Sequence, residues 1–343
     1  MIKTKDGQDP RVMEDMFYAK RFAFSYSSLN KLCYSPRLFY KHYVLGERED
    51  ELDKSLVDGR VIHTLLLEQD SFSDQFIIAQ TKLPSDNVKE VIGKIYARHL
   101  LEKVARKEED VRYSLTQYSE EILEELKDKN LYQKMSDELK LTKIVNEEGV
   151  EYFNFLKDAT GKTVIDSTTY ARCVDVVDIL KNHECMKRMG LHPSNNNLED
   201  VYEELEFVFN MDEDDFPFDI KGIIDNVFVD RENETVWIND LKTTSKTIAE
   251  FPDTVQFYNY WMQAAIYMRA MRYLMSDRHP GYDVIFSFVV VDKFNQVYVF
   301  EVSDDTMANW EIDLQLKLKE AKYHYERRDY SLPYKFLKSK VIL

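Results

Sequence analysis

The sequence predicts an α/β fold in which helices flank a mixed central sheet and a large helical insertion interrupts the chain. Two observations lead to this prediction. The stretch 86–197 is highly charged and mostly helical in pattern, whereas the alternating and wholly apolar runs typical of strands lie after residue 200. From residue 57 onward the predicted order is a helix, the insertion, three strands, a helix, two strands and a final helix, which is typical of an α/β domain.

The composition is that of a globular protein with a substantial core. The 343 residues are 44% hydrophobic and 13% aromatic. We expect one domain over residues 1–343, with its core at about 24–70 and 200–328 and the insertion at about 86–197. No apolar stretch approaches the roughly 20 residues that span a bilayer, and the N-terminus lacks the apolar segment of a signal peptide. A soluble cytoplasmic protein with no membrane partner is therefore expected.

Charge and cysteine content exclude several classes of protein. The net charge of −16 argues against a passive nucleic-acid binder, which needs basic surface to displace counterions. It does not exclude an enzyme that binds DNA through a local basic groove and metal ions. Cys33, Cys173 and Cys185 are too few and too scattered for a disulfide framework, a four-cysteine zinc site or an iron–sulfur cluster. We expect free thiols.

The N-terminal part predicts helices with clear boundaries. Residues 24–45 read as a capped helix, a Ser-Pro break and an aromatic-rich helix, with Ser27 or Ser28 as the N-cap. Residues 57–69 have apolar side chains on most sides, which favours a buried helix. The segment "SEEILEELKDKNLYQKM" in the insertion is amphipathic, and "GLHPSNNN" at 190–197 predicts an irregular break.

The C-terminal part changes to strand periodicity. Strands are predicted at 201–211, 218–229 and 234–242, then at 283–291 and 296–302, and helices at 254–276 and 304–328. The run "DREN" at 230–233 supplies turn residues between the second and third strands. A tight hairpin centred on Glu232 and Asn233 would place Asp225 directly opposite Asp240. Lys242 would share their face, because side chains along a strand repeat every two residues.

Three charged groups would then converge. Two close carboxylates repel each other, and a divalent cation such as Mg²⁺ removes that conflict. With Asp225 and Asp240 as ligands and Lys242 beside the attacking water, the chemistry indicated is metal-assisted phosphodiester hydrolysis. The plainer alternative is an ordinary strand end with solvated charges. The apolar residues 222–224 just before Asp225 make a solvated acid unexpected there.

These motifs together resemble the PD-(D/E)xK nuclease superfamily, in which an acid on one strand is followed by acid-x-Lys on the next. The segments "KGIIDNVFV" and "VWINDLKTT" carry the resemblance, and the similarity is greatest to RecB-type nuclease domains and exodeoxyribonuclease VIII-like phage exonucleases. The resemblance covers roughly residues 24–70 and 200–300. It implies a restriction-endonuclease-like core.

Four further motifs match in the family's order. The segment "FSYSSLNKLCYSPRLFYKHYVLG" resembles its opening helix motif, with Ser27 and Pro36 in the typical places. "GRVIHTLLLE" resembles its Gly-x-x-x-His helix, in which Gly59 and His63 hold the motif positions. Glu206 matches an acid on the preceding strand, and "QAAIY", from Gln263 to Tyr267, matches a Gln-x-x-x-Tyr helix.

The resemblance implies a role for each matching residue. His63, Asp225, Asp240 and the Leu241 backbone carbonyl would hold Mg²⁺, for which Mn²⁺ could substitute. Lys242 would act on the nucleophilic water, and Glu206 would bind a second metal or accept a proton. The remaining matching residues would support the site or contact DNA: Gln263, Tyr267, Thr243, Thr244 and Ser27. The alternative for His63, Glu206 and Tyr267 is an ordinary packing or surface role.

The implied activity is a Mg²⁺-dependent DNA exonuclease that resects double-stranded ends in phage-type recombination or repair, in a bacterial or phage-infected cytoplasm. A single-strand annealing protein and a homo-oligomeric ring are the partners implied. Some relatives carry an iron–sulfur cluster, but Ser35 precedes Pro36 here, so no cluster is expected. Three alternatives stay open: a single-strand-specific or endonucleolytic enzyme, a catalytically idle DNA-processing or assembly subunit, and a protein–protein adaptor acting through the insertion.

Overall fold

The computed structural model describes residues 9–47, 54–79, 82–106, 111–195 and 200–340. The chain divides into two compact units. The core unit comprises Met1–Glu68 and Val176–Leu343, and the inserted unit comprises Gln69–Asp175. Each unit is considered by itself. None of the helices in the described segments is long and apolar enough to cross a membrane.

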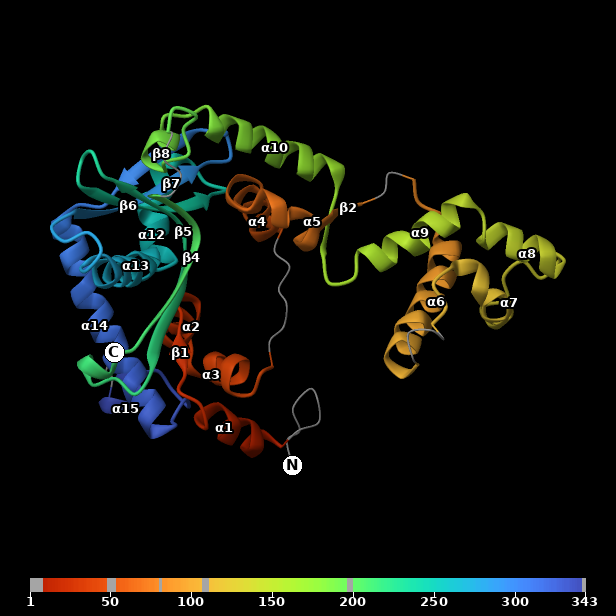
Figure 1. Ribbon diagram of the computed structural model, residues 1–343. Coiled ribbons are helices and arrows are strands. Elements are labelled where there is room, and N and C mark those ends of the chain that lie inside the picture. Colours follow the sequence, from red (N-terminus) through yellow and green to blue (C-terminus); the bar gives the residue numbers. More distant parts are fainter. Residues whose placement is uncertain (1–8, 48–53, 80–81, 107–110, 196–199, 341–343) are drawn as a thin grey trace. The chain divides into compact units, whose positions relative to one another are not determined.

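A six-stranded mixed sheet forms the centre of the core unit (Figure 1). Its strand order is β1-β5-β6-β7-β8, with β4 paired to the remaining edge of β5. The pairs β4–β5, β5–β6 and β7–β8 are antiparallel, and β1–β5 and β6–β7 are parallel. The strands are β1 (Ala23–Phe24), β4 (Val201–Phe209), β5 (Asp219–Asp230), β6 (Thr235–Thr243), β7 (Asp283–Val291) and β8 (Val297–Glu301).

The helices of the core unit cover both sides of this sheet, with α13 on one side and α4 on the other (Figure 1). They are α1 (Pro10–Tyr18), α2 (Tyr26–Tyr34), α3 (Pro36–Phe39), the π-helix Tyr40–Val44, α4 (Lys54–Leu67), α11 (Cys185–Arg188), α12 (Phe251–Phe257), α13 (Tyr260–Met275), α14 (Asp304–Arg327) and α15 (Tyr334–Lys338). Short 3₁₀ turns lie at Asp212–Asp214 and Ile248–Glu250. Helix α10 (Ser167–Lys181) contains the boundary between the two units.

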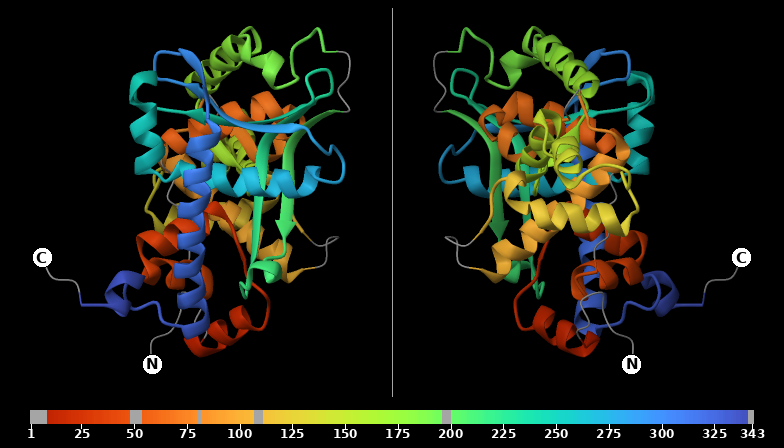
Figure 2. Two further views of the ribbon diagram at one scale, coloured as in Figure 1. Left: turned by 90° about the vertical axis from the view of Figure 1, so that its left-hand side faces the viewer. Right: turned by 90° about the vertical axis from the view of Figure 1, so that its right-hand side faces the viewer.

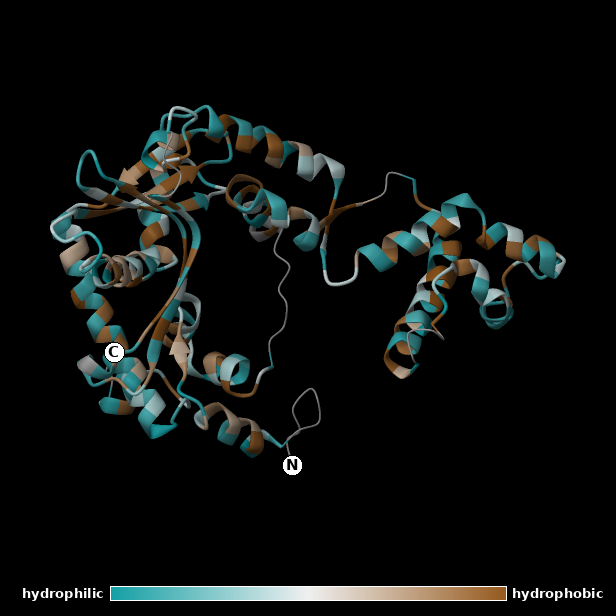
Figure 3. Ribbon diagram, in the orientation of Figure 1, coloured by the Kyte–Doolittle hydropathy of each residue, from teal (hydrophilic) through white to brown (hydrophobic). Residues whose placement is uncertain are grey.

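The hydrophobic core lies between the sheet and α13, α14 and α2. Helices α13 and α14 pack against each other (Figure 2). The strand β7 is buried from Phe286 to Val291, as its unbroken apolar run predicts for a central strand. Hydrophobic residues accordingly concentrate on the central strands (Figure 3). The sheet therefore provides a rigid, buried platform for polar residues at its strand ends.

The inserted unit has a separate hydrophobic core formed by α6, α7, α9 and the turn before α7. Its elements are a 3₁₀ turn (Gln69–Ser71), α5 (Phe72–Gln75), β2 (Phe76–Ile78), α6 (Asp86–Ala105), a 3₁₀ turn (Leu115–Tyr118), α7 (Ser119–Asp128), α8 (Asp137–Ile144), α9 (Glu147–Asp158) and β3 (Thr163–Ile165). Strands β2 and β3 form a small parallel pair. The amphipathic helix expected over "SEEILEELKDKNLYQKM" is α7, which buries Ile122 and Leu126 but ends at Asp128, because Asn130 adopts a left-handed conformation with φ of 55°.

The predicted α/β class with a mixed central sheet flanked by helices is confirmed. Two details differ. The N-cap of α2 is Ser25 rather than Ser27 or Ser28, because Ser25 and Ser28 form a reciprocal capping box. The helix expected at 254–276 is two helices, α12 and α13, because Asn259 between them adopts a left-handed conformation with φ of 58°.

Candidate active site

The hairpin of β5 and β6 has the register that the sequence predicts. Asn226 pairs with Asn239 and Val227 with Ile238, so Asp225 and Asp240 occupy the next opposed position. The ladder ends there, because β5 turns to pair with β1 at Asp219 and Ile220 while β6 continues along β7. In place of a ladder hydrogen bond, the Leu241 N–H donates to Asp225 Oδ2 at 2.8 Å. The two strands therefore separate where the carboxylates lie.

A third acid, Glu204, enters from β4. The β4–β5 ladder pairs Glu203 with Asn226 and Leu205 with Ile224, and it skips the intervening opposed residues Glu204 and Asp225. Glu204 has φ of 50°, a left-handed conformation that costs a non-glycine residue about 1–2 kcal/mol. Such an outlier persists only where the surrounding structure holds it. It marks Glu204 as a residue of the site.

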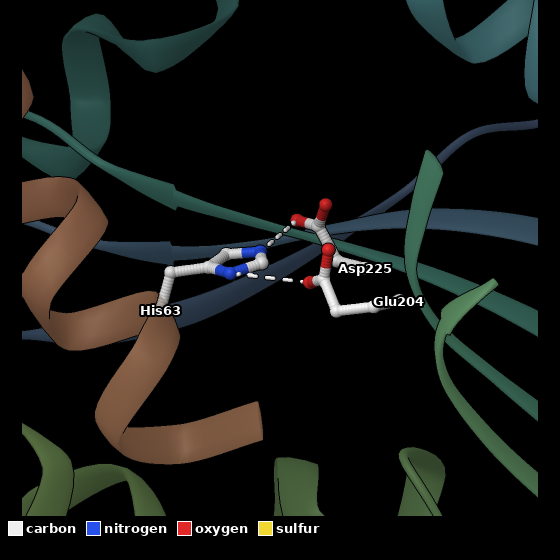
Figure 4. A group of neighbouring side chains, drawn as sticks. All are labelled: His63, Glu204 and Asp225. Carbon is white, nitrogen blue, oxygen red and sulfur yellow. Dashed lines mark ion pairs between the residues drawn. The ribbon is translucent and has the colours of Figure 1, made fainter. Parts of the chain in front are cut away.

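His63 on α4 links Glu204 and Asp225 (Figure 4). Its Nε2 lies 3.2 Å from Asp225 Oδ2 and its Nδ1 lies 3.2 Å from Glu204 Oε1. The helix can approach β6 closely because Gly59, one turn earlier, has no side chain; a Cβ atom there would lie 2.9 Å from Thr243 Oγ1. One ligand atom from each of His63, Glu204 and Asp225 lies within 4.8 Å of the others.

Asp240 and Lys242 form a buried pair beside this group. The Lys242 Nζ lies 2.5 Å from Asp240 Oδ2, and the Asp240 side chain is 0% exposed. Neither Asp240 oxygen has a well-oriented hydrogen-bond donor among the residues that the structure describes. The Lys242 ammonium also lies 5.0 Å from the ring centre of Tyr260 on α13. A bound cation would satisfy buried carboxylate oxygens that have no such donor.

A buried hydrogen-bond network fixes the hairpin next to these acids. Asn239 Nδ2 donates to Asn226 Oδ1 at 2.8 Å, and Ser287 Oγ on β7 donates to Asn239 Oδ1 at 2.9 Å. Asn226 Nδ2 and Asn239 Nδ2 also donate to the backbone carbonyls of Met189 and Arg188. Since all three side chains are fully buried, the network ties β5, β6 and β7 together one residue away from Asp225 and Asp240.

The electrostatics show a surplus of negative charge. Burial raises the pKa of Asp240 to about 7. The positive charge of Lys242 opposes this rise, and the negative charge of Asp225 adds to it. Burial likewise raises the pKa of Glu204 to about 7. Burial opposes ionisation of Asp225, but the hydrogen bond and charge of His63, with Lys242 and the Leu241 N–H, lower its pKa.

At the two cationic groups the nearby carboxylates outweigh burial, so both groups have a raised pKa. Burial disfavours the charged form of His63, but its hydrogen bond to Asp225 and the charges of the three acids raise its pKa to about 9. Burial also works against the charge on Lys242, which Asp240 and Asp225 outweigh, so its pKa is raised. Three carboxylates thus share two cationic side chains, and two of the three have a raised pKa, which fits a site for a divalent cation.

Helix α13 supports the site from the side of Lys242. Gln263 Nε2 donates to Tyr267 Oη at 2.9 Å, and both side chains are buried. Burial, with the charges of Asp240 and Asp225, raises the pKa of Tyr267 well above its usual value. The Tyr267 ring packs edge-on against Phe207, over Gly222, where a Cβ atom would lie within 3.0 Å of both rings. The contacts of this pair lie within the core, close to the acids.

The remaining predicted residues lie around this group. Thr243 Oγ1 faces Gly59 of α4, and Thr244 Oγ1 accepts a hydrogen bond from the Lys246 N–H. Ser27 and Glu206 line a cavity of about 420 Å³ together with Tyr267. Glu206 is exposed and pairs with Ile223, two residues from the opposed pair of Glu204 and Asp225. The β4 acid that meets His63 is therefore Glu204, and Glu206 lies beside the cavity.

Sequence reasoning missed Glu204 and the Asn226–Asn239–Ser287 network. The loop 210–218 between β4 and β5 is too long and irregular to fix a register, so nothing in the sequence distinguishes Glu204 from Glu206. A signal for the network was present: the same hairpin register that opposes Asp225 and Asp240 also opposes Asn226 and Asn239.

Comparison with known proteins gives a family match over most of the chain. The family model described as PD-(D/E)XK nuclease superfamily matches residues 23–330. No curated protein matches the chain. Among solved structures, the chain is similar to a candidate exonuclease from Eubacterium rectale, with 11% identity and a TM-score of 0.42 over 93% of this chain and 86% of that one. It is also similar to SSO0001, with 15% identity and a TM-score of 0.24 over 49% of this chain and 69% of that one.

Proposed function

This chain belongs to the PD-(D/E)XK nuclease superfamily, and from that premise we propose that it is a Mg²⁺-dependent DNA exonuclease, active also with Mn²⁺. The observation that carries this proposal is the convergence of His63, Glu204, Asp225, Asp240 and Lys242 where β5 and β6 separate. A structural ion-pair network has no need to bury three acids against two bases, whereas a metal-dependent phosphodiesterase does.

The residues present fit a divalent cation. Asp225, Asp240 and Glu204 offer carboxylate oxygens, which suit Mg²⁺ and Mn²⁺, and His63 and the Leu241 carbonyl would serve as further ligands. When bound, the cation supplies a Lewis acid for the phosphate and favours ionisation of the attacking water.

The side chains of this protein supply orientation and charge. Lys242, held by Asp240, donates hydrogen bonds from Nζ toward the attacking water and the phosphate, and its charge offsets the negative charge that develops there. Asp225 is fixed by the Leu241 N–H and by His63, so its remaining oxygen keeps one direction. Gln263 and Tyr267 lie on α13 close to the acids, where they would support the site, and Thr243 and Thr244 would donate to a phosphate oxygen.

The preference for DNA ends is supported by the order of the sequence motifs from Ser27 to Tyr267, which resembles that of exodeoxyribonuclease VIII-like enzymes. On the same basis we infer resection of double-stranded ends in phage-type recombination or repair, in a bacterial or phage-infected cytoplasm. An annealing protein as partner and a ring of several copies belong to this proposal. So does the absence of an iron–sulfur cluster.

The test is cleavage of end-labelled linear duplex DNA with Mg²⁺, beside a closed circular duplex of the same sequence. We expect the linear DNA to be degraded and the circle to stay intact. Asp240→Asn and Lys242→Ala should each lower the rate about 100- to 1000-fold, the cost of removing one electrostatic contact to a developing charge. Glu232→Gln, an exposed residue in the turn of the same hairpin, is the matched control.

The outcomes separate the candidates. Cleavage of the circle, which has no ends, would show that the protein is an endonuclease acting through the same site. Equal inertness of wild type and variants, with Mn²⁺ also supplied, would contradict the nuclease proposal and favour an idle processing subunit or an adaptor.

A further inference from the structure

The junction of α12 and α13 exposes two aromatic rings. Phe257 is 73% exposed and Tyr258 is 47% exposed. Apolar and aromatic periodicity predicts one continuous helix here, but the chain bends at Asn259, and the bend places both rings at the surface. Exposing such rings gives up the favourable free energy of their burial.

The bend is held firmly. The Tyr258 carbonyl accepts hydrogen bonds from Tyr26 Oη at 2.5 Å and from Asn30 Nδ2 at 3.2 Å. Asn259 Nδ2 donates to Asn30 Oδ1 at 2.8 Å, and Trp261 Nε1 donates to Asn259 Oδ1 at 3.1 Å. Side chains from α2 and α13 thus fix both residues of the bend, and the exposed rings stand on a rigid support.

A chain of ring contacts joins these residues to the candidate active site. Phe257 and Tyr258 meet edge to face at 4.9 Å, and Tyr258 stacks on Tyr260 at 5.5 Å with an angle of 26° between the rings. Tyr260 in turn lies 5.0 Å from the Lys242 ammonium. A second ammonium, that of Lys246, lies 5.8 Å from the Phe257 ring centre. Three aromatic rings therefore lead outward from Lys242 and end beside the ammonium group of Lys246.

We propose that Phe257 and Tyr258 form a stacking platform for an unpaired nucleobase of the DNA strand bound at the active site, with Lys246 contacting its phosphate. Aromatic faces interleaved with cations are the usual means of holding a single strand without sequence preference. The chain carries a net charge of −16, so phosphate contacts alone give it little affinity, and base stacking supplies what they lack. This inference rests on the proposed function.

The platform defines the substrate more closely. A base can stack on a ring only when it has left its own pair, so the strand at the site is single, or is a frayed duplex end with at least one unpaired nucleotide.

Exposure alone does not distinguish Phe257, because Phe294 is 65% exposed and lies 5.1 Å from the Lys293 ammonium. Phe294, in the turn between β7 and β8, lacks the ring contacts that lead to Lys242, and so it provides a matched control.

The experiment is equilibrium binding of a fluorescein-labelled oligothymidylate to the full chain, followed by anisotropy with Ca²⁺ in place of Mg²⁺. An oligomer of the same length without bases and a blunt duplex hairpin serve as comparison probes. We expect Phe257→Ala to raise the Kd for oligothymidylate about tenfold, as loss of one stacked base predicts. Phe257→Trp should restore binding, and Phe294→Ala should leave it unchanged. The base-free oligomer should bind wild type as weakly as the Phe257→Ala variant and show no further loss in that variant.

Two results would overturn the platform: Phe257→Ala and Tyr258→Ala binding oligothymidylate as wild type does, or Phe294→Ala weakening it equally. Absence of oligothymidylate binding by the wild type and all variants would overturn it as well.

Failure of the nuclease proposal can be distinguished from failure of the platform. If the wild type does not cleave DNA but its binding of oligothymidylate depends on Phe257, the platform is supported and the nuclease proposal fails. If the wild type cleaves DNA but its binding does not depend on Phe257, the nuclease proposal is supported and the platform fails.

Discussion

Glu204 has a backbone conformation that glutamate rarely adopts, and it has it directly opposite Asp225. A relaxed strand at this position would restore the ladder hydrogen bonds and remove the strain. The side chain instead reaches His63 Nδ1, so that one imidazole is shared by two acids from neighbouring strands. Strain of about 1 kcal/mol or more is retained where several acids must converge on one point.

Substitution at this position tests the assignment. Glu204→Gln should lower the cleavage rate and weaken Mn²⁺ binding about 10- to 100-fold, the range typical of groups that ligate or orient a metal site. The same change at Glu206 should cost less than tenfold, because Glu206 lies beside the cavity rather than against His63. Single-turnover rates and calorimetric titration of Mn²⁺ measure both. A larger loss at Glu206 would reverse the assignment.

These acids also show how far the residue pattern could lead. The turn "DREN" sets the register of its hairpin, so Asp225, Asp240 and Lys242 could be placed from the sequence, and that register is confirmed. Glu204 and Glu206 could not be separated, because both alternate to the same face of an ideal strand. The choice between them depends on a left-handed backbone conformation that glutamate itself does not specify.

The β5–β6 hairpin is an element whose end is held by side chains instead of by its own ladder. Asn226, Asn239 and Ser287 bond across three strands, and the next position opens to expose the carboxylates to each other. Removing the central amide would leave Asn226 Oδ1 and Ser287 Oγ buried without their partner. Such groups are costly, since each loses its hydrogen bonds to water and gains none in return.

Asn239→Ala should therefore lower the free energy of unfolding of the core unit by about 2–3 kcal/mol. Urea denaturation followed by tryptophan fluorescence measures this. Ser287→Ala, which removes one end of the network, should cost about 1 kcal/mol. A loss at Asn239 no greater than that at Ser287 would show that the network is not cooperative.

The bounds of helices and strands were predicted best where runs of apolar residues determine them. The run 283–291 is β7 to the residue, because seven of its nine side chains are β-branched or aromatic. The break at Asn259 was missed, because its cause is a set of hydrogen bonds with Asn30 and Tyr26, far away in sequence. Ser25 as the N-cap of α2 was missed among three serines that local propensity ranks alike.

At the scale of the whole molecule, the inserted unit carries a polar cluster of its own. Glu102 accepts hydrogen bonds from Arg112 Nε at 3.3 Å and from Tyr118 Oη at 3.1 Å, and Arg112 Nη2 also lies 2.6 Å from Glu121. The hydrogen bond from Arg112 lowers the pKa of Glu102. Nothing in the charged sequence of 86–190 singles out this cluster, because its members come from α6, from the irregular segment before the 3₁₀ turn Leu115–Tyr118, from that turn and from α7.

The lowered pKa predicts acid lability of the inserted unit. A carboxyl group whose pKa falls on folding stabilises the folded state above its unfolded pKa of about 4.3, and this contribution is lost as the pH falls through the folded value. Glu102→Gln should thus lower stability by about 1–2 kcal/mol at pH 7, and the difference from wild type should shrink as the pH falls below about 4.3 and through the lower, folded value. Glu124→Gln, at a more exposed ion pair with Arg98, should cost less than about 0.5 kcal/mol.

The position of the tryptophans makes this measurable in the full chain. Trp237, Trp261 and Trp310 all belong to the core unit, whereas the inserted unit is largely helical. Glu102→Gln should therefore shift the urea transition seen by far-ultraviolet circular dichroism and leave the fluorescence transition in place. Equal shifts in both signals would mean that the two units unfold together.

His63 and the acids it meets lie on opposite sides of the inserted unit in sequence, and so do β1 and its partner β5. During synthesis, α4 leaves the ribosome long before the strands against which it packs. The inserted unit, with its separate core, can fold in that interval. The core unit must wait for β5, β6 and α13. A nascent chain therefore lacks the candidate active site until β6 has been made, and a product truncated before β6 should show none of the proposed activity.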